Sequence, residues 1–151
     1  MHTTILILHS WLRWVALVAG VAATIAALRD TPPPPAKSRA DRWGLILMAT
    51  LDLQMLLGLV MYLTVTLPSI QGRMAEVMRD PAARFFAVEH ITMMMGAVVI
   101  THVGRVLARK SATADSKKMK LLVCFGIATV LMLLAVPWPG MRAGRPLFRV
   151  S

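Results

Sequence analysis

The chain has only one cysteine, Cys124, among its 151 residues. A single cysteine forms no internal disulfide and cannot supply the CxxC or cysteine-rich patterns of many metal sites. Cys124 lies inside an apolar stretch, where we expect it to pack as a small hydrophobic side chain. The sequence also lacks an HExxH metal motif, a phosphate-binding loop and a nucleophile elbow. These absences argue against the hydrolases and transferases that depend on such motifs.

Acidic residues are scarce, with 7 Asp and Glu against 17 Lys and Arg, which gives a formal net charge of +10. In a soluble protein such an excess would favour nucleic-acid binding. Here 57% of the residues are hydrophobic and the mean hydropathy is +0.65. The basic residues lie almost entirely between or beyond the long apolar segments, where they steer topology and contact anionic lipid. We therefore expect the lipid bilayer as the partner, and no nucleic acid.

Long apolar segments account for most of the chain: residues 5–28, 44–67, 85–107 and 119–138. A helix needs about 20 apolar residues to cross the hydrocarbon core of a bilayer. We predict an all-α integral membrane protein, a four-transmembrane-helix up-down bundle that forms a single membrane domain over residues 1–151. No Lys or Arg precedes the first segment, and it is longer than the apolar region of a usual signal peptide, so we expect it to remain in place.

The distribution of basic residues predicts the orientation. The links 29–42 and 109–120, with Arg105 just before the second, carry ten Lys and Arg between them. The opposite side carries six: Arg73, Arg79, Arg84, Arg142, Arg145 and Arg149. Cytoplasmic loops carry the excess of Lys and Arg, which predicts both links in the cytoplasm and both termini in the periplasm.

Two histidines, His9 and His90, occupy matching positions in the first and third segments. Each lies about five residues inside the outer end of its segment, and the two segments run in the same direction, so the imidazoles are expected at one depth. Each histidine also heads a helical stripe of mostly small residues. The stripes are Arg13, Ala16, Gly20, Ala23 and Ala27 after His9, and Met94, Ala97, Thr101, Gly104 and Ala108 after His90.

This pattern favours a cofactor held between two diagonal helices. Ionisable groups are costly inside a membrane, and bundles hold cofactors between facing helices. Small residues such as Gly20 and Ala97 would leave room for a flat macrocycle, with His9 and His90 as axial ligands of haem iron. The alternative is that the small stripes let the helix backbones pack closely and the histidines only donate hydrogen bonds. Arg13 and Arg84 are candidates to neutralise haem propionates.

Asp52 and His102 form a second candidate polar site. Both are expected at a similar depth on the cytoplasmic side, with His102 about 18 Å along its helix from His90. We predict that they contact one another, either as a buried hydrogen-bonded pair or as a proton relay to a quinone. His102 is offset by about 120° from the stripe of His90.

Several pieces of the chain resemble a known family. The pieces LHSWLRW (8–14), DLQMLLGLVMYL (52–63), RFFAVEHITMMM (84–95) and VPWP (136–139) are similar to those of small four-helix bacterial membrane proteins described as cytochrome-b-like. The resemblance implies haem b, electron transfer and the bacterial inner membrane, with His9 and His90 matching the family's histidines. It also implies a histidine where this chain has Asp52, so a second haem would lack a ligand.

Together these observations predict a b-type cytochrome, or a haem-binding electron-transfer subunit, with one bis-histidine haem near the outer face. With so little chain outside the membrane, we expect a subunit that works with other membrane subunits, or with a quinone, rather than a stand-alone enzyme. The alternative is a non-redox accessory subunit of a respiratory or photosynthetic complex. A copper-handling protein is a weaker alternative, since no exposed loop is rich in Met and His.

Overall fold

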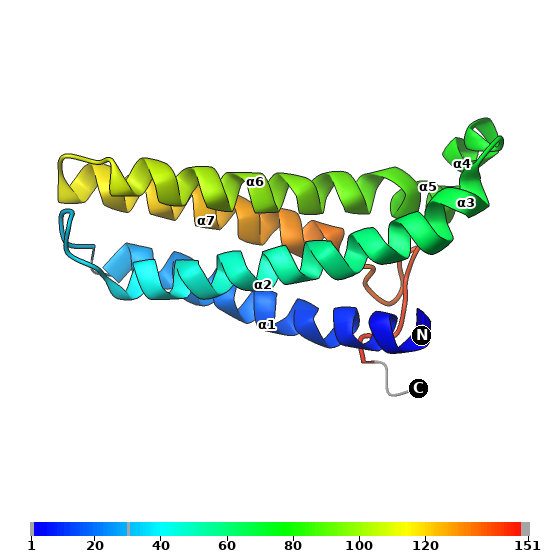
Figure 1. Cartoon of the computed structure of the whole chain (residues 1–151), viewed down its shortest axis with the longest axis horizontal. Helices are drawn as coiled ribbons and strands as arrows, with labels where there is room; N and C mark the ends of the chain where they lie inside the picture. The colour runs from blue at the N-terminus through cyan, green and yellow to red at the C-terminus, as the bar shows by residue number, and fades with distance from the viewer. Residues whose placement is uncertain (1, 30, 149–151) are drawn as a thin grey trace.

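The computed structural model describes residues 2–29 and 31–148 and is all-α within them, without a β-strand. Arg149, one of the basic residues used to predict the orientation, lies outside the described residues. Four helices are long (Figure 1): α1 (His2–Arg29), α2 (Arg39–Met61), α6 (His90–Arg109) and α7 (Ala114–Ala135).

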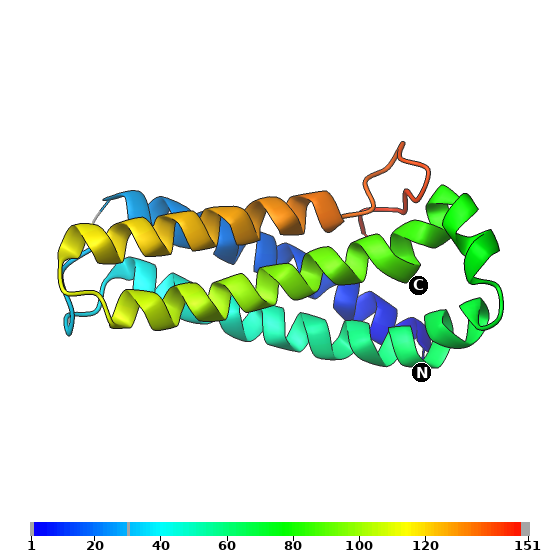
Figure 2. The same ribbon diagram turned by 90° about the horizontal axis from the view of Figure 1, so that it is seen from above.

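The long helices form an up-down bundle, as predicted. Helix α1 packs against α2 and α7, and α6 packs against the same two helices. Helices α1 and α6 are therefore diagonal partners (Figure 2). Both basic links lie at one end of the bundle, while the start of α1 and the segment that follows α7 lie at the other (Figure 1). The helices that carry His9 and His90 thus run in the same direction.

Four helical stretches within the described residues are long and apolar enough to cross a membrane: Thr3–Arg29, Arg39–Ile70, Pro81–Arg109 and Ala114–Ala135. The chain is a multi-pass membrane protein. The fourth helix ends earlier than the predicted residue 138. Val136 is extended because Pro137 follows it, and proline disfavours helical backbone at the preceding residue. Trp138 therefore belongs to the turn after the bundle.

Short helical pieces connect α2 to α6 at the end opposite the basic links (Figure 1): the π-helical turn η1 (Tyr62–Thr66), α3 (Leu67–Ile70), α4 (Met74–Arg79), α5 (Pro81–Arg84) and the π-helical turn η2 (Phe85–Glu89). Pro68 lacks the N–H that an α-helix needs, which accounts for the wider turn before it. Between α3 and α4 the chain turns at Gly72, which has a φ of 72°. Within residues 67–84 only Ile70 and Val77 are buried, and they pack near Ala87.

The small-residue stripes of α1 and α6 face the interior. Ala23, Ala27, Ala97 and Ala108 are at most 1% exposed. Toward the basic links, large side chains from α2 and α7 fill the space between these stripes: Leu47, Leu51, Leu121 and Phe125. The half of the bundle nearer the links is therefore a packed core.

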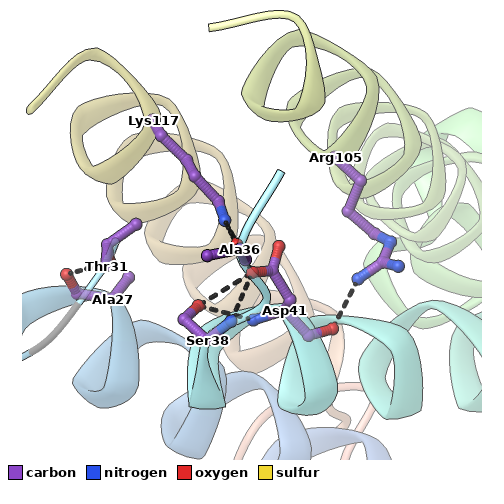
Figure 3. Close-up of polar contacts among 7 residues, drawn as sticks. All are labelled: Ala27, Thr31, Ala36, Ser38, Asp41, Arg105 and Lys117. Carbon is purple, nitrogen blue, oxygen red and sulfur yellow. Dashed lines mark hydrogen bonds and ion pairs between the residues drawn. The ribbon is translucent and has the colours of Figure 1, made fainter. Parts of the chain in front are cut away.

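A polar cluster closes the link end (Figure 3). Lys117 of α7 is buried, and its Nζ donates to the carbonyl of Ala36 and to Oδ2 of Asp41, each over 2.8 Å. Ser38 caps α2 through reciprocal hydrogen bonds with Asp41. Arg105 of α6 donates to the Asp41 carbonyl over 2.9 Å (Figure 3). The α1–α2 link is thus fastened to both α6 and α7.

Candidate cofactor site

The rings of His9 and His90 meet across the bundle near the end opposite the basic links. Their centroids are 6.2 Å apart and their planes are inclined by 62°. The expected common depth of the two imidazoles is therefore confirmed. Two metal–nitrogen bonds of roughly 2 Å each, plus the depth of each ring, add to about 6 Å. The spacing fits two imidazoles on opposite sides of one metal ion. It also lies within the range of an ordinary edge-to-face ring contact.

The ring of His90 is held from two sides. Its Nδ1 lies 2.8 Å from the carbonyl oxygen of Ala135. A carbonyl only accepts, so Nδ1 carries the proton and the lone pair of the neutral ring is on Nε2. Phe85 and Phe86 pack on the ring with centroids 5.9 and 6.4 Å away. This is the arrangement of metal-binding histidines, which usually donate their second ring nitrogen to a carbonyl or carboxylate.

The ring of His9 lies close to Gly58 of α2, and one of its ring nitrogens has no hydrogen-bond partner among the described residues. Its Nδ1 is buried and has no hydrogen-bond partner among the described residues. Gln54 of α2 donates to the backbone carbonyl of His9 over 3.0 Å, which fixes the helix at this level. A Cβ placed on Gly58 would lie 3.2 Å from Cε1 of the ring. The absence of a side chain at Gly58 therefore makes room for the imidazole.

A cavity of about 390 Å³ surrounds the two rings, within the usual 300–1,000 Å³ range of ligand pockets. Its walls are mostly apolar and come from α1, α2, η1, α6, the end of α7 and the segment after it. They include Ala16, Leu17, Met55, Met94 and Met132. Two cations, Arg13 and Arg145, also line it, and no acidic side chain does so within the described part of the chain.

The donor set limits what the cavity can bind. Among the described residues, no group of three or more His, Cys, Asp or Glu side chains is placed to hold a metal ion. A metal ion between His9 and His90 would need its remaining ligands from a bound group. The two histidines alone therefore do not complete a metal site, and a bound group would have to supply the other ligands.

The two π-helical turns position the site. Turn η2 ends at Glu89, immediately before His90, and π-turns frequently occur at functional sites. The Tyr62 hydroxyl of η1 donates to the Ala87 carbonyl of η2 over 3.2 Å. This bond ties the end of α2 to the start of α6 beside the cavity.

The remaining predicted site residues divide into two groups. Arg13 lines the cavity, as expected. Gly20 and Ala97 do not line it, because they lie deeper, where helices pack closely: a Cβ on Gly20 would lie 2.7 Å from Met132 Cε, and Ala97 is fully buried in the core. Arg84 is not at the cavity either, and pairs with Glu89 over 2.6 Å.

Asp52 and His102 do contact one another, with Oδ2 and Nε2 3.4 Å apart. The pair is not buried, however: the two side chains are 47% and 43% exposed. The angular offset of His102 from the inward stripe turns it to the outer face of α6. Its Nδ1–H donates to the Val98 carbonyl over 3.0 Å. The pair therefore lies on the outer surface of the bundle, well apart from the cavity.

Sequence reasoning missed three residues of the site: Gln54, Gly58 and Arg145. A polar Gln54 inside an apolar segment, one helical turn before Gly58, was a usable signal, because such residues are costly in a membrane unless they have a role. Arg145 gave no such signal, since it entered only the count of charges. Its place depends on the path of the chain after α7.

Comparisons with protein-family models, with curated proteins and with solved structures found no match to this chain.

Proposed function

We propose that the protein is a membrane b-type cytochrome that holds one haem between His9 and His90 near the outer end of the bundle. The observation that carries the proposal is the 6.2 Å spacing of the two rings inside a largely apolar cavity. When bound, haem supplies a one-electron iron couple. The resemblance of the sequence to cytochrome-b-like membrane proteins supports the same conclusion.

The protein's own residues would perform three tasks. The hydrogen bond from His90 to Ala135 keeps the His90 ring in the tautomer that can ligate. Gln54 and Gly58 hold and accommodate the His9 ring from the neighbouring helix. The apolar walls exclude water, which tunes the reduction potential of a buried iron centre.

One haem fits better than two. Between the small stripes nearer the links, the interior is packed by Leu47, Leu51 and Phe125, and His102 faces outward beside Asp52. We propose that the Asp52–His102 pair instead handles protons for a quinone that reaches this face from the lipid. A second redox subunit is the other candidate electron partner. We place the protein in the bacterial inner membrane with both termini in the periplasm, supported by the excess of basic residues at the link end.

A non-redox accessory subunit is the competing function. The ring spacing also suits an edge-to-face contact, and His90 already has a hydrogen-bond partner in Ala135. The buried Nδ1 of His9 has no partner among the described residues; a bound group ligated through this nitrogen would satisfy it, whereas a purely structural role leaves it unpaired.

The test is an absorption spectrum of the purified protein with three matched variants. The wild type should show reduced-minus-oxidised bands of a low-spin b-type haem. His9→Ala and His90→Ala should each abolish these bands while membrane insertion persists. His102→Ala is the control, because it removes a histidine from the same helix as His90 but outside the cavity, and it should keep the bands. A wild type without haem bands, or variants that all retain them, would overturn the proposal.

A further inference from the structure

The segment after α7, residues 137–148, folds back against α1 and the end of α7, and its residues Pro137, Arg145 and Pro146 line the cavity. Helix α7 ends at Ala135, and the chain then loops so that the N–H of Arg145 donates to the Pro137 carbonyl over 3.1 Å. Within the loop, Gly144 donates to the carbonyl of Met141 over 2.8 Å. Figure 2 shows this segment at the same end as α3–α5. The loop brings Arg145 next to the end of α7.

Helix α1 anchors the far end of this segment. Arg13 Nη2 and Trp14 Nε1 both donate to the Leu147 carbonyl, over 2.6 and 3.3 Å. The Phe148 ring stacks on Trp14 with centroids 5.4 Å apart and planes inclined by 20°, and it also contacts Trp11. Residues 145 and 146, which line the cavity, are thus held between two anchored points of the chain.

Arg145 brings a positive charge to the wall of the cavity. It lines the cavity together with Pro146, and its guanidinium carbon lies 5.4 Å from the ring centre of Phe86. Phe86 in turn packs on His90. No acidic side chain lines the cavity within the described residues. A cation in the wall of a cavity that no described acidic residue lines favours an anionic ligand group.

We propose that Arg145 binds a carboxylate on the edge of the ligand that occupies this cavity. The inference rests on the proposed function, in which that carboxylate is a haem propionate. The planar guanidinium can donate two parallel hydrogen bonds to one carboxylate, the strongest common ion-pair geometry. Arg145 takes the role that the sequence suggested for Arg84, whose guanidinium is paired with Glu89 instead.

The experiment compares haem b with its dimethyl ester, in which both propionates are esterified and uncharged. The full-length apoprotein is reconstituted in detergent with each porphyrin, and affinity is measured from the Soret band. Wild type should bind haem between about tenfold and a hundredfold more tightly than the ester, the range for losing a charge-assisted hydrogen bond. Arg145→Gln should lose a similar factor for haem and should distinguish little between the two ligands, because the two changes remove one interaction.

Arg142→Gln is the matched control. Arg142 belongs to the same loop but does not line the cavity, so this variant should keep the wild-type preference for haem over the ester. Arg145→Lys keeps the positive charge but cannot donate two parallel hydrogen bonds to one carboxylate. This variant should therefore keep only part of the preference for haem over the ester. The wild-type comparison needs no substitution, so the test stands even if Arg145→Gln fails to fold.

The outcomes separate the two proposals. Equal binding of haem and ester by the wild type, or the same preference in Arg145→Gln as in Arg142→Gln, overturns the role of Arg145 and leaves the haem site intact. The absence of a bis-histidine spectrum with either porphyrin in the wild type overturns the haem proposal, and the role of Arg145 with it.

Discussion

The imidazole Nδ1 of His90 donates a hydrogen bond to the carbonyl oxygen of Ala135, the last residue of α7, over 2.8 Å. Ala135 is 1% exposed, so its carbonyl has little access to other donors. The bond therefore links the start of α6 to the end of the neighbouring helix. His9, across the cavity, makes no comparable bond through its own Nδ1.

This asymmetry predicts different costs for replacing the two histidines in the apoprotein. His90→Met leaves the Ala135 carbonyl unpaired and should lower the free energy of unfolding by about 1–3 kcal/mol. His9→Met removes a buried nitrogen that had no partner and should cost less. Thermal unfolding of the two haem-free variants in one detergent measures the difference. Equal losses would mean that the bond to Ala135 contributes nothing to stability.

In the haem-loaded protein, His90→Met should retain haem where His90→Ala loses it, because methionine can also be an axial ligand. Exchange of an imidazole for a thioether raises the reduction potential of haem. Spectroelectrochemical titration of the two proteins would measure the shift. An unchanged potential would mean that residue 90 does not ligate the iron.

Gly58→Ala should loosen the site without harming the fold. The new Cβ would lie 3.2 Å from Cε1 of His9, so the ring must move off its position at a cost of about 0.5–1.5 kcal/mol, up to roughly tenfold in haem affinity. Gly96→Ala is the control, because its Cβ would crowd Leu131 Cδ1 to a similar 3.3 Å outside the cavity. If both variants bind haem equally well, Gly58 has no special part in placing His9.

The buried ion pair at the link end should be important for stability. Lys117→Met leaves Asp41, which is only 19% exposed, without its cation, and breaking such a pair costs about 3–5 kcal/mol. Lys118→Met alters the next, partly exposed residue of α7 and should change stability by no more than about 0.5 kcal/mol. Denaturation of both variants in detergent tests this. A double variant with Asp41→Asn should recover part of the loss, since it removes the uncompensated charge.

The Asp52–His102 pair predicts a kinetic effect if it handles protons. Asp52→Asn should keep the haem content but slow quinol-driven haem reduction by about a hundredfold, the lower end of what a positioned general acid–base group contributes. Stopped-flow reduction over a range of pH measures the rate. An unchanged rate and pH profile would show that the pair is structural only.

Much of the architecture could be predicted from the sequence because membrane crossing depends on local composition. Segments of about 20 apolar residues must form helices to satisfy their backbone groups in lipid. Alternating direction then places the first and third helices parallel, and the helical period places His9 and His90 above inward stripes. These properties follow from residue spacing along single helices, so no tertiary contact was needed to predict them.

Contacts between distant segments could not be predicted in this way. The sequence did not reveal that α7 ends before Pro137, nor that the chain after it places Arg145 in the cavity wall. It also did not reveal that Lys117 pairs with Asp41. It predicted the contact between Asp52 and His102 but did not reveal that both side chains are partly exposed, because the rotation of each helix about its axis is set by packing with its neighbours. The lengths of the apolar segments and the helical spacing of residues within them determined where the helices form and which residues face the interior of the bundle. Only the tertiary structure decided how each helix is rotated and which loop lines the cavity, because these depend on packing against residues far away in the sequence.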